Sequence, residues 1–382
     1  MNPLQQLERL GQSVWYDNIS RGILQSGELE RMVRNGILGV TSNPTIFDKA
    51  ISGSTDYDDQ LRGLLERDPA MSAAEIIKAL MITDIQMAAD VLRPVYERSA
   101  GRDGYISVEV SPHRARDTEG TVIEARELWT TIGRPNLMIK IPATDEGLRA
   151  IARAINEGIN INVTLIFSVE RYRQVTDAYL AGLEQRIRSR NPVDQIASVA
   201  SLFVSRVDTL VDELLQKRIA ATADEAPASR LRALQGKAAV ANARLVYQTF
   251  KEIFHGPRFA ALRAKGARVQ RPLWGSTGTK NPAYSDLLYV EPLVGPDTVN
   301  TVPPQTLDAI VDHLKPSLTI EQDGAGARAT IDQLVREGID MTWVMKKLED
   351  DGVAAFARSF DALAANLQAK RGVLAPRMAR KS

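Results

Sequence analysis

Lys140 is the residue whose type and position in this sequence most strongly suggest chemistry. It lies in the apolar run Leu137–Thr144, which reads as a β-strand; side chains alternate in such a run, so Met138, Lys140 and Pro142 share one face. An amine inside a buried strand is costly unless it is paired or neutralised. A desolvated amine is also a nucleophile that can form a Schiff base with a carbonyl. The alternative is a structural lysine held in a salt bridge.

Two further predicted strands carry polar residues in a matching phase. Ser107 and Glu109 share one face of the strand before Lys140, and Asn162 and Thr164 share one face of the strand after it. The opposite faces are apolar, so we expect them to pack beneath helices while the polar faces point inward. A carboxylate, a hydroxyl and an amide around an amine are suited to moving protons during covalent catalysis.

Asp17 and Asn43 close the first two predicted strands and could complete such a site. The polar candidates also have structural alternatives. Asp17 could cap a turn, and Asn43 before Pro44 could be a turn residue. Glu109 could be a strand-end ion-pair partner of the lysine, which would still bring the two together. Thr164 could be an ordinary β-branched strand residue.

The segment Gly275–Lys280 follows the seventh predicted strand, is rich in glycine, serine and threonine, and ends in a lysine. Loops of this kind present backbone N–H groups to phosphate. The segment lacks the spacing of a Walker A motif, so a nucleotide is not implied. Arg206, one strand earlier, could supply a second cation. The alternative is an ordinary glycine- and serine-rich turn.

Eight β-like runs organise the chain. They are Gln12–Asn18, Ile37–Asn43, Tyr105–Val110, Leu137–Ala143, Ile161–Phe167, Ile196–Ser205, Val269–Thr277 and Val299–Pro303, and helix-like stretches separate most of them. This alternation predicts an α/β fold of parallel βαβ units, and eight units predict a (β/α)8 TIM barrel with its chemistry at the C-terminal ends of the strands. A doubly wound open sheet is the alternative, but the glycine-rich turn typical of that fold does not follow the first run.

Additional N- and C-terminal helices are expected around the barrel. A short helix at Leu4–Leu10 precedes the first strand, and about 304–371 reads as a helical extension packed on a single barrel domain of residues 1–382. The connections Thr45–Gly104 and Asp208–Lys265 are each long enough for two helices, and the second contains a proline- and alanine-rich break near Ala226–Ala228. The basic tail from Arg371 is expected to fray.

The composition narrows the class of protein. Of 382 residues, 44% are hydrophobic and 25% are charged, and the net charge of +1 gives no electrostatic reason to expect nucleic acid or an anionic membrane. The chain has no cysteine, which excludes disulfides and thiolate catalysis, and its three histidines lack the spacing of a metal site. No signal or membrane segment is recognisable, so we expect a cytoplasmic protein.

Several segments together resemble the transaldolase family. They are Val40–Phe47, Ser107–Val110, Met138–Thr144, Asn162–Ser168, Trp274–Pro282 and Thr298–Pro303, and they occur in order over about residues 10–370. The chain looks like the longer bacterial branch of that family, which has extra C-terminal helices. The resemblance implies a class I aldol mechanism with neither a metal nor another cofactor.

The resemblance also implies a role for each candidate. Lys140 would attack the ketone of a ketose phosphate and form the Schiff base, and Asp17 would take a hydroxyl proton to trigger carbon–carbon cleavage. Glu109 would shuttle protons through a water held by Thr164. The remaining positions would bind substrate: the dihydroxyacetone portion by Asn43 and Asn162, and the distal region with its phosphate by Ser201, Phe203, Arg206, Ser276 and Lys280.

Some positions depart from the wider family pattern. The shorter branch has Ser-x-Arg where this chain has the segment ending in Lys280, and Leu202 and Ser205 stand where proline and glycine are more frequent. Phe203 matches transaldolases, whereas the related fructose 6-phosphate aldolases usually have tyrosine there and glutamine in place of Glu109. Both of these last positions favour group transfer over simple cleavage.

The expected function is that of a pentose phosphate pathway transaldolase. It would transfer a dihydroxyacetone unit from sedoheptulose 7-phosphate to glyceraldehyde 3-phosphate, and give erythrose 4-phosphate and fructose 6-phosphate. The alternatives are a lyase that acts on fructose 6-phosphate and a non-catalytic barrel that only binds sugar phosphate. The expected partners are small-molecule sugar phosphates, and the chain would be a monomer or a homodimer.

Overall fold

The computed structural model describes the backbone of residues 1–378 and the side chains of residues 1–372. Eight parallel strands form a closed barrel in chain order. They are β1 (Gln12–Tyr16), β2 (Gly39–Val40), β3 (Tyr105–Glu109), β4 (Leu137–Pro142), β5 (Ile161–Ile166), β6 (Ser198–Phe203), β7 (Arg271–Gly275) and β8 (Thr298–Val302). The barrel closes where β1 pairs in parallel with β8 along its whole length. This closure confirms the predicted (β/α)8 barrel and excludes an open sheet.

Every predicted strand is present, although most are shorter than the sequence suggested. The C-terminal ends of the strands are shortened where the chain turns into the next helix: α4 (Pro44–Ser52) and α10 (Ser205–Ala220) begin within or beside the predicted second and sixth runs. Arg206 therefore lies in the first turn of α10 rather than at a strand end. The polar strand ends are thus the start of the βα segments, which is where a barrel of this kind carries its site.

More helices than expected lie between β2 and β3. The first half of the chain contains α1 (Pro3–Arg9), α2 (Arg21–Gln25), α3 (Glu28–Asn35), α4, α5 (Asp58–Arg67), α6 (Ala73–Arg98), the 3-10 turn η1 (Pro112–Arg114), α7 (Thr118–Ile132), α8 (Asp145–Glu157) and α9 (Val169–Arg188). Three helices, α4, α5 and α6, occupy the connection that the sequence showed to be long enough for two. Ser72 and Glu75 form a capping box that starts α6 as a separate helix.

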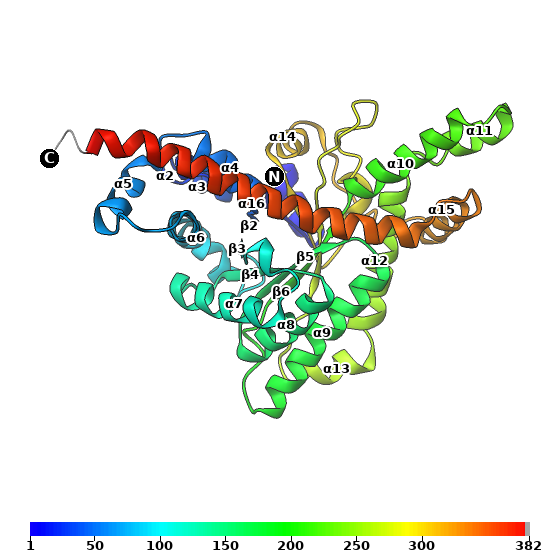
Figure 1. Cartoon of the computed structure of the whole chain (residues 1–382). Helices are drawn as coiled ribbons and strands as arrows, with labels where there is room; N and C mark the ends of the chain where they lie inside the picture. The colour runs from blue at the N-terminus through cyan, green and yellow to red at the C-terminus, as the bar shows by residue number, and fades with distance from the viewer. Residues whose placement is uncertain (379–382) are drawn as a thin grey trace.

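The connection between β6 and β7 also holds more than the two helices predicted. It contains α10, α11 (Glu225–Arg232), α12 (Ala238–Phe254) and α13 (Pro257–Arg263). The break predicted near Ala226–Ala228 lies slightly earlier, between the end of α10 at Ala220 and the start of α11 at Glu225, and Ala226–Ala228 themselves are inside α11. Pro227 is tolerated there because it sits in the first turn, where backbone N–H groups have no partner within the helix. Figure 1 shows α11 projecting from the barrel beyond α10.

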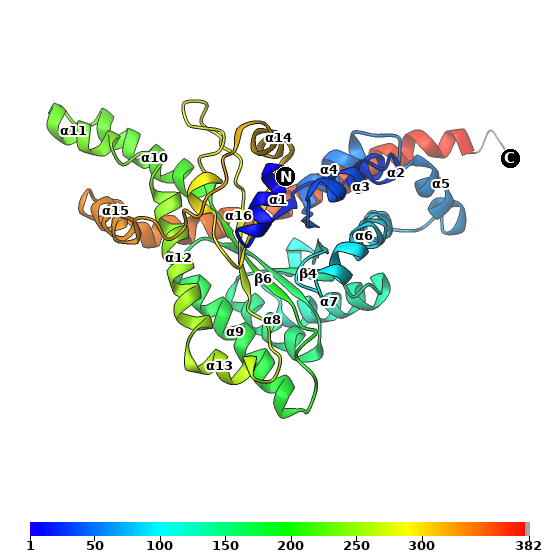
Figure 2. The ribbon, with the colours of Figure 1, turned by 180° about the vertical axis from the view of Figure 1, so that it is seen from behind.

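The helices expected after the last strand are present. After the short turn η2 (Glu291–Leu293) and β8 come α14 (Pro304–His313), α15 (Gly324–Arg336) and α16 (Met341–Met378). The long helix α16 crosses one end of the barrel, from the side of α15 to the side of α5 (Figures 1 and 2). It continues to Met378, so the tail that was expected to fray from Arg371 is helical up to that residue; residues 379–382 lie outside the described residues. Within residues 1–378, no helix is both long and apolar enough to cross a membrane.

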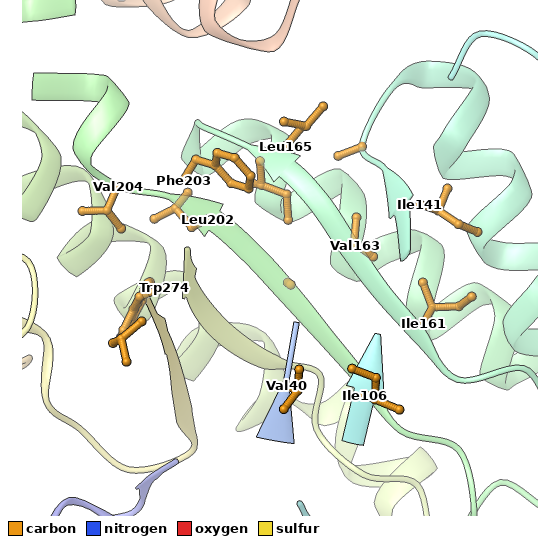
Figure 3. Packing of buried hydrophobic residues seen from close by; sticks show 14 of the residues in the cluster. Val40, Ile106, Ile141, Ile161, Val163, Leu165, Leu202, Phe203, Val204 and Trp274 are labelled. Carbon is orange, nitrogen blue, oxygen red and sulfur yellow. The ribbon is translucent and has the colours of Figure 1, made fainter. Parts of the chain in front are cut away.

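Two apolar layers fill the space inside and outside the strands. A small cluster that includes Trp15 and Met138 lies within the barrel. A larger cluster lies between the strands and the helices, and it includes Val163 and Leu165 of β5 (Figure 3). The strand phase expected from the sequence is therefore correct, because the apolar face of β5 packs outward while the face of β4 that carries Lys140 points inward.

Candidate active site

A cavity of about 610 Å³ opens at the C-terminal ends of the strands. Eight of the predicted site residues line it, namely Asp17, Asn43, Lys140, Ser201, Phe203, Arg206, Ser276 and Lys280. The other three, Glu109, Asn162 and Thr164, are buried next to these in the barrel wall. The sheet register explains their proximity, because Lys140 is paired with Glu109 on one side and with Asn162 on the other. All eleven residues thus gather at one end of the barrel.

Lys140 borders the cavity with its side chain almost removed from solvent. The residue is 5% exposed, and its Nζ donates a hydrogen bond to the backbone oxygen of Ser42 at 3.2 Å. Oε2 of Glu109 lies 3.5 Å from Nζ, which is an ion-pair contact but too long for a strong hydrogen bond. The amine is therefore loosely held and remains accessible from the cavity.

Glu109 is a buried carboxyl with unused hydrogen-bonding capacity. Neither of its carboxylate oxygens accepts a hydrogen bond from the residues that the structure describes. Burial raises the pKa of Glu109 to about 7, and the neighbouring Lys140 cation opposes this rise. A carboxyl that titrates near neutral pH can both give and take a proton. The alternative of a simple ion pair accounts for the contact with Lys140 but not for the unsatisfied oxygens.

Thr164 lies where the pairing of β5 is irregular. Its buried hydroxyl has no hydrogen-bond partner in the described part of the chain. The register of β5 against β6 shifts between Val163 and Ile166, and Leu165 has a φ of +59°. A leucine at positive φ is strained by about 1–3 kcal/mol. Bulges and strain of this kind gather next to active sites, where they re-aim side chains. Thr164 thus lies on an irregular stretch of β5 with its hydroxyl unpaired among the described residues.

Asp17 directly follows β1, and its carboxylate is hydrogen-bonded to the first of two linked threonine hydroxyl groups. Its Oδ1 accepts a hydrogen bond from Thr41 Oγ1 at 2.7 Å, and Thr41 in turn contacts Thr301 Oγ1 at 2.6 Å. Burial raises the pKa of Asp17, while the cations of Lys140 and Lys280 and the hydrogen bond from Thr41 oppose the rise. The carboxylate is thus fixed in position and lies within the electrostatic reach of the lysine.

The two asparagines differ in how they are held. Asn43 is the N-cap of α4, where its Oδ1 accepts a hydrogen bond from Ile46 N at 3.0 Å; it is a helix cap rather than the turn residue considered from the sequence. It also lines the cavity. Asn162 is fully buried; its Nδ2 donates to Ser107 Oγ at 3.0 Å, and its Oδ1 accepts from Ser201 Oγ at 2.7 Å. Capping therefore positions Asn43, and a hydrogen-bonded row across three strands positions Asn162.

The far side of the cavity carries two cations. The guanidinium of Arg206 stacks over the ring of Phe203 at 5.2 Å. Burial lowers the pKa of Arg206, and Asp351 of α16 opposes this effect. Ser276 contacts Ser205 through the hydroxyl groups at 3.0 Å and has a φ of +55°, whereas Lys280 is exposed at the rim.

Within the described residues, no group of three or more His, Asp or Glu side chains is placed to hold a metal ion.

A family model described as transaldolase/fructose-6-phosphate aldolase matches residues 14–367 of this chain. The chain belongs to this family. A transaldolase of Trichodesmium erythraeum is 47% identical over 378 residues, which are 98% of this chain and 99% of the relative. A transaldolase of Thermobifida fusca is 52% identical over 364 residues, 95% of this chain and 96% of the relative. A transaldolase of Mycolicibacterium smegmatis is 49% identical over 376 residues, 98% of each.

Two tyrosines of this family member anchor the loop after β7, and the sequence analysis missed them. Tyr284 donates a hydrogen bond to Asp212 Oδ2 at 2.6 Å, and Tyr289 donates to Asp208 Oδ2 at 3.0 Å. Both carboxylates belong to α10, the helix whose first turn carries Arg206. The loop with Ser276 and Lys280 is therefore fixed to the same helix as Arg206. The four-residue spacing of the two aspartates was the available signal, because it places them on one helix face.

Phe356 is a further residue of this family member that sequence reasoning missed. The sequence analysis included it only as part of the helical extension at about 304–371. In the structure Phe356 lines the cavity, and its ring lies 5.7 Å from Lys140 Nζ and 6.4 Å from the ring of Phe203. Nothing in the helical periodicity distinguishes a core residue from one that faces a cavity, so the sequence offered no signal for this contact.

Proposed function

We propose that this chain is a transaldolase that works through a Schiff base at Lys140. It transfers a dihydroxyacetone unit from sedoheptulose 7-phosphate to glyceraldehyde 3-phosphate, and releases erythrose 4-phosphate and fructose 6-phosphate. The observation that carries the proposal is the buried Lys140 amine next to Glu109, a carboxyl with a pKa of about 7, at a cavity of about 610 Å³. The relatives named transaldolase, which align over almost the whole chain, support the same activity.

The first step forms an iminium. The neutral Lys140 amine adds to carbon 2 of the ketose, and the carbonyl oxygen leaves as water. That water takes one proton from the amine nitrogen and one from Glu109, so the products are a cationic iminium and an ionised Glu109. A carboxyl with a pKa near 7 suits this exchange, because it is present in both forms at neutral pH. A water held by Thr164, whose hydroxyl has no partner among the described residues, relays the proton.

The second step breaks the bond between carbons 3 and 4. Asp17, held by Thr41, takes the proton of the hydroxyl on carbon 4, and the bonding electrons move to the iminium. An aldose phosphate leaves, and a neutral three-carbon enamine stays on Lys140. The enamine then attacks the aldehyde carbon of the acceptor, Asp17 returns its proton to the new hydroxyl, and hydrolysis of the iminium frees Lys140.

The remaining residues hold the substrate. Asn43 and Asn162 bind the dihydroxyacetone portion, with Asn162 acting through its hydrogen-bonded row with Ser201. Arg206 binds the phosphate, and Ser276 and Lys280 complete the phosphate site from the loop after β7. Phe203 supports Arg206 by stacking on its guanidinium, which orients the cation toward an anion in the cavity.

The leading rival is a lyase that cleaves fructose 6-phosphate without an acceptor. Two residues, Phe203 and Glu109, match transaldolases rather than the related aldolases. Glu109 lies 3.5 Å from Lys140, and Phe203 contacts Phe356, so both are close to the amine. A barrel that only binds sugar phosphate would have no use for an amine beside a carboxyl that titrates near pH 7, because a buried, poorly paired charge is destabilising.

The test is the release of glyceraldehyde 3-phosphate from fructose 6-phosphate, with and without erythrose 4-phosphate. Without the acceptor, a transaldolase stops after the first cleavage, because the dihydroxyacetone unit stays on Lys140; sustained release therefore depends on the acceptor. Equal release without the acceptor would make the protein an aldolase. No release under either condition would leave only a binding function.

A further inference from the structure

Phe356 is the residue through which α16 reaches the cavity. It is 4% exposed, and it stands over the reacting amine with its ring centre 5.7 Å from Lys140 Nζ. Its ring also meets the ring of Phe203 at 6.4 Å and a steep angle of 64°. The Arg206 guanidinium stacks on Phe203, so two neighbouring aromatic rings lie between the amine and this cation. The wall between the two functional ends of the cavity is therefore apolar.

The position of this ring is fixed by contacts on both sides of it along α16. Before it, Asp350 pairs with Arg116 at 2.8 Å. After it, Ser359 contacts Thr45 at 2.8 Å through the hydroxyl groups. Thr45 follows β2 and Arg116 follows β3, so the strands that hold the site also hold the helix that covers it.

The approach of α16 to the barrel is close at the turn before Phe356. A side chain at Gly352 would place its Cβ 2.9 Å from Leu165 Cδ2, and Leu165 is the strained residue that follows Thr164. Only glycine fits at that distance without a shift of its neighbour. The helix is therefore seated directly on the irregular part of β5, and it cannot rise without losing several contacts at once.

The proposed enzyme faces a chemical problem that this ring could solve. After cleavage the enamine waits on Lys140 while the first aldehyde leaves and the second enters. If water and a proton reach it, carbon 3 is protonated, water adds at carbon 2, and the carbon–nitrogen bond breaks, which releases dihydroxyacetone and the free amine. Exclusion of water from a reactive intermediate is a recognised task of active-site covers.

Resting on the proposed Schiff-base function, we propose that Phe356 determines how the enamine is divided between the acceptor aldehyde and water. The ring covers the Lys140 nitrogen and the adjacent carbons with an apolar surface, while the cavity remains open on the side of Arg206 and Lys280 for the acceptor. Phe356 thus favours transfer over hydrolysis without taking or giving a proton.

The test compares Phe356→Ala, Phe356→Gln and Phe356→Leu in the full chain. For each, dihydroxyacetone released from fructose 6-phosphate without acceptor is divided by the rate of transfer to erythrose 4-phosphate. We expect this ratio to rise about tenfold or more in the alanine and glutamine variants, because the apolar cover is lost. Leucine keeps an apolar cover and should restore a ratio near that of the unaltered protein.

A purely structural role would give a different result. Val344, buried on the same helix three turns earlier, does not line the cavity, so Val344→Ala should lower total activity without moving the ratio. An unchanged ratio in all Phe356 variants would overturn the inference while leaving transaldolase activity intact. If alanine prevents folding, the glutamine and leucine variants still decide the matter. An unaltered protein without acceptor-dependent transfer would instead refute the proposed function.

Discussion

The barrel holds a buried cation–carboxylate pair at each end. At the N-terminal ends of the strands, Arg271 lies 3.1 Å from Asp103. Asp103 also accepts hydrogen bonds from Ser13 Oγ at 2.8 Å and from Trp15 Nε1 at 3.1 Å. Arg271 donates further to Ser13 Oγ at 2.5 Å and to the backbone oxygen of Thr298 at 3.1 Å. Both carboxylate oxygens of this pair are therefore satisfied.

The pair at the other end has the same charges and almost the same burial but few partners. Lys140 and Glu109 are separated by 3.5 Å, and the carboxylate accepts no hydrogen bond from the described residues. Burial raises the pKa of Glu109 to about 7. A buried pair is stable when hydrogen bonds replace the lost water, and poorly hydrogen-bonded pairs of this kind are found where chemistry needs them. The two ends thus separate a fully hydrogen-bonded pair from a poorly hydrogen-bonded one, and we propose that the second is the reactive pair.

Lys140→Met should break the reactive pair with the largest effect on activity. Turnover should fall by more than about 10⁴-fold, the upper end of what proton-transfer groups contribute, because no iminium can form. The substitution nearly conserves volume, and Glu109 can take up a proton, so stability should change by less than about 1.5 kcal/mol. Steady-state kinetics and thermal unfolding measure both. Lys217→Met, on the exposed face of α10, is the matched control; full turnover of the Lys140 variant would contradict the account.

Glu109→Ala should lower turnover by about 10²–10⁴-fold, the usual contribution of a general acid–base group. The loss should appear in kcat, because formation and hydrolysis of the iminium both need the proton transfer. Stopped-flow or steady-state assays with fructose 6-phosphate and erythrose 4-phosphate measure it. A near-normal rate in a folded variant would reassign Glu109 to a structural ion pair.

Asp103→Ala should show the opposite pattern at the other end. Arg271 would keep its charge without its carboxylate, which costs about 3–5 kcal/mol in the free energy of unfolding. Activity per folded molecule should stay close to normal, because the pair lies far from the cavity. Denaturant unfolding measures the loss. Asp90→Ala removes an exposed partner of Arg134 and should cost less than about 1 kcal/mol; equal losses in both variants would remove the distinction.

The raised pKa of Glu109 predicts a pH dependence of stability. The folded state prefers the neutral carboxyl, so this contribution to stability is complete below the unfolded pKa of about 4.5 and is lost as the pH rises through about 7. Glu109→Gln should remove the dependence, with a difference from the unaltered protein of roughly 3 kcal/mol across that window. Unfolding at several pH values measures it, and parallel curves for the two proteins would show that Glu109 is not perturbed.

Arg206→Ala should have the smallest effect, chiefly on substrate binding. Arg206 stacks on Phe203, and its guanidinium faces the cavity, whereas both terminal nitrogens of Arg271 already donate hydrogen bonds within the barrel. Arg206 therefore keeps donors for a phosphate. The KM for fructose 6-phosphate should rise roughly 10- to 100-fold, with a smaller change in kcat. Arg258→Ala, on the surface at α13, is the matched control. A fall in kcat without a rise in KM would argue against a binding role.

The sequence predicted the barrel and the residues at its active end because both follow local rules. Period-two alternation placed Glu109, Lys140 and Thr164 on inward faces, and the order of strands made their ends converge. The number of helices between two strands was harder to predict. Single residues set where a helix begins, such as the capping Ser72 and the first-turn Pro227, and the spacing of apolar residues does not reveal them.

Long-range placement explains what the sequence could not provide. The contact of Phe356 with Lys140 joins residues more than two hundred positions apart, and it depends on how α16 is seated on β5. The anchoring of the loop after β7 by Tyr284 and Asp212 depends in the same way on the relative position of two segments. The sequence does not identify the partner in either contact: the four-residue spacing of Asp208 and Asp212 places both on one helix face but does not point to the tyrosines.

The most direct measurement is borohydride reduction of the protein with fructose 6-phosphate, followed by peptide mass spectrometry. The account predicts one reduced sugar adduct, located on Lys140, and its absence from Lys140→Met. The adduct should be absent when borohydride is added without sugar. An adduct on another lysine, or none in an active protein, would contradict the claim that this pair is the reactive one.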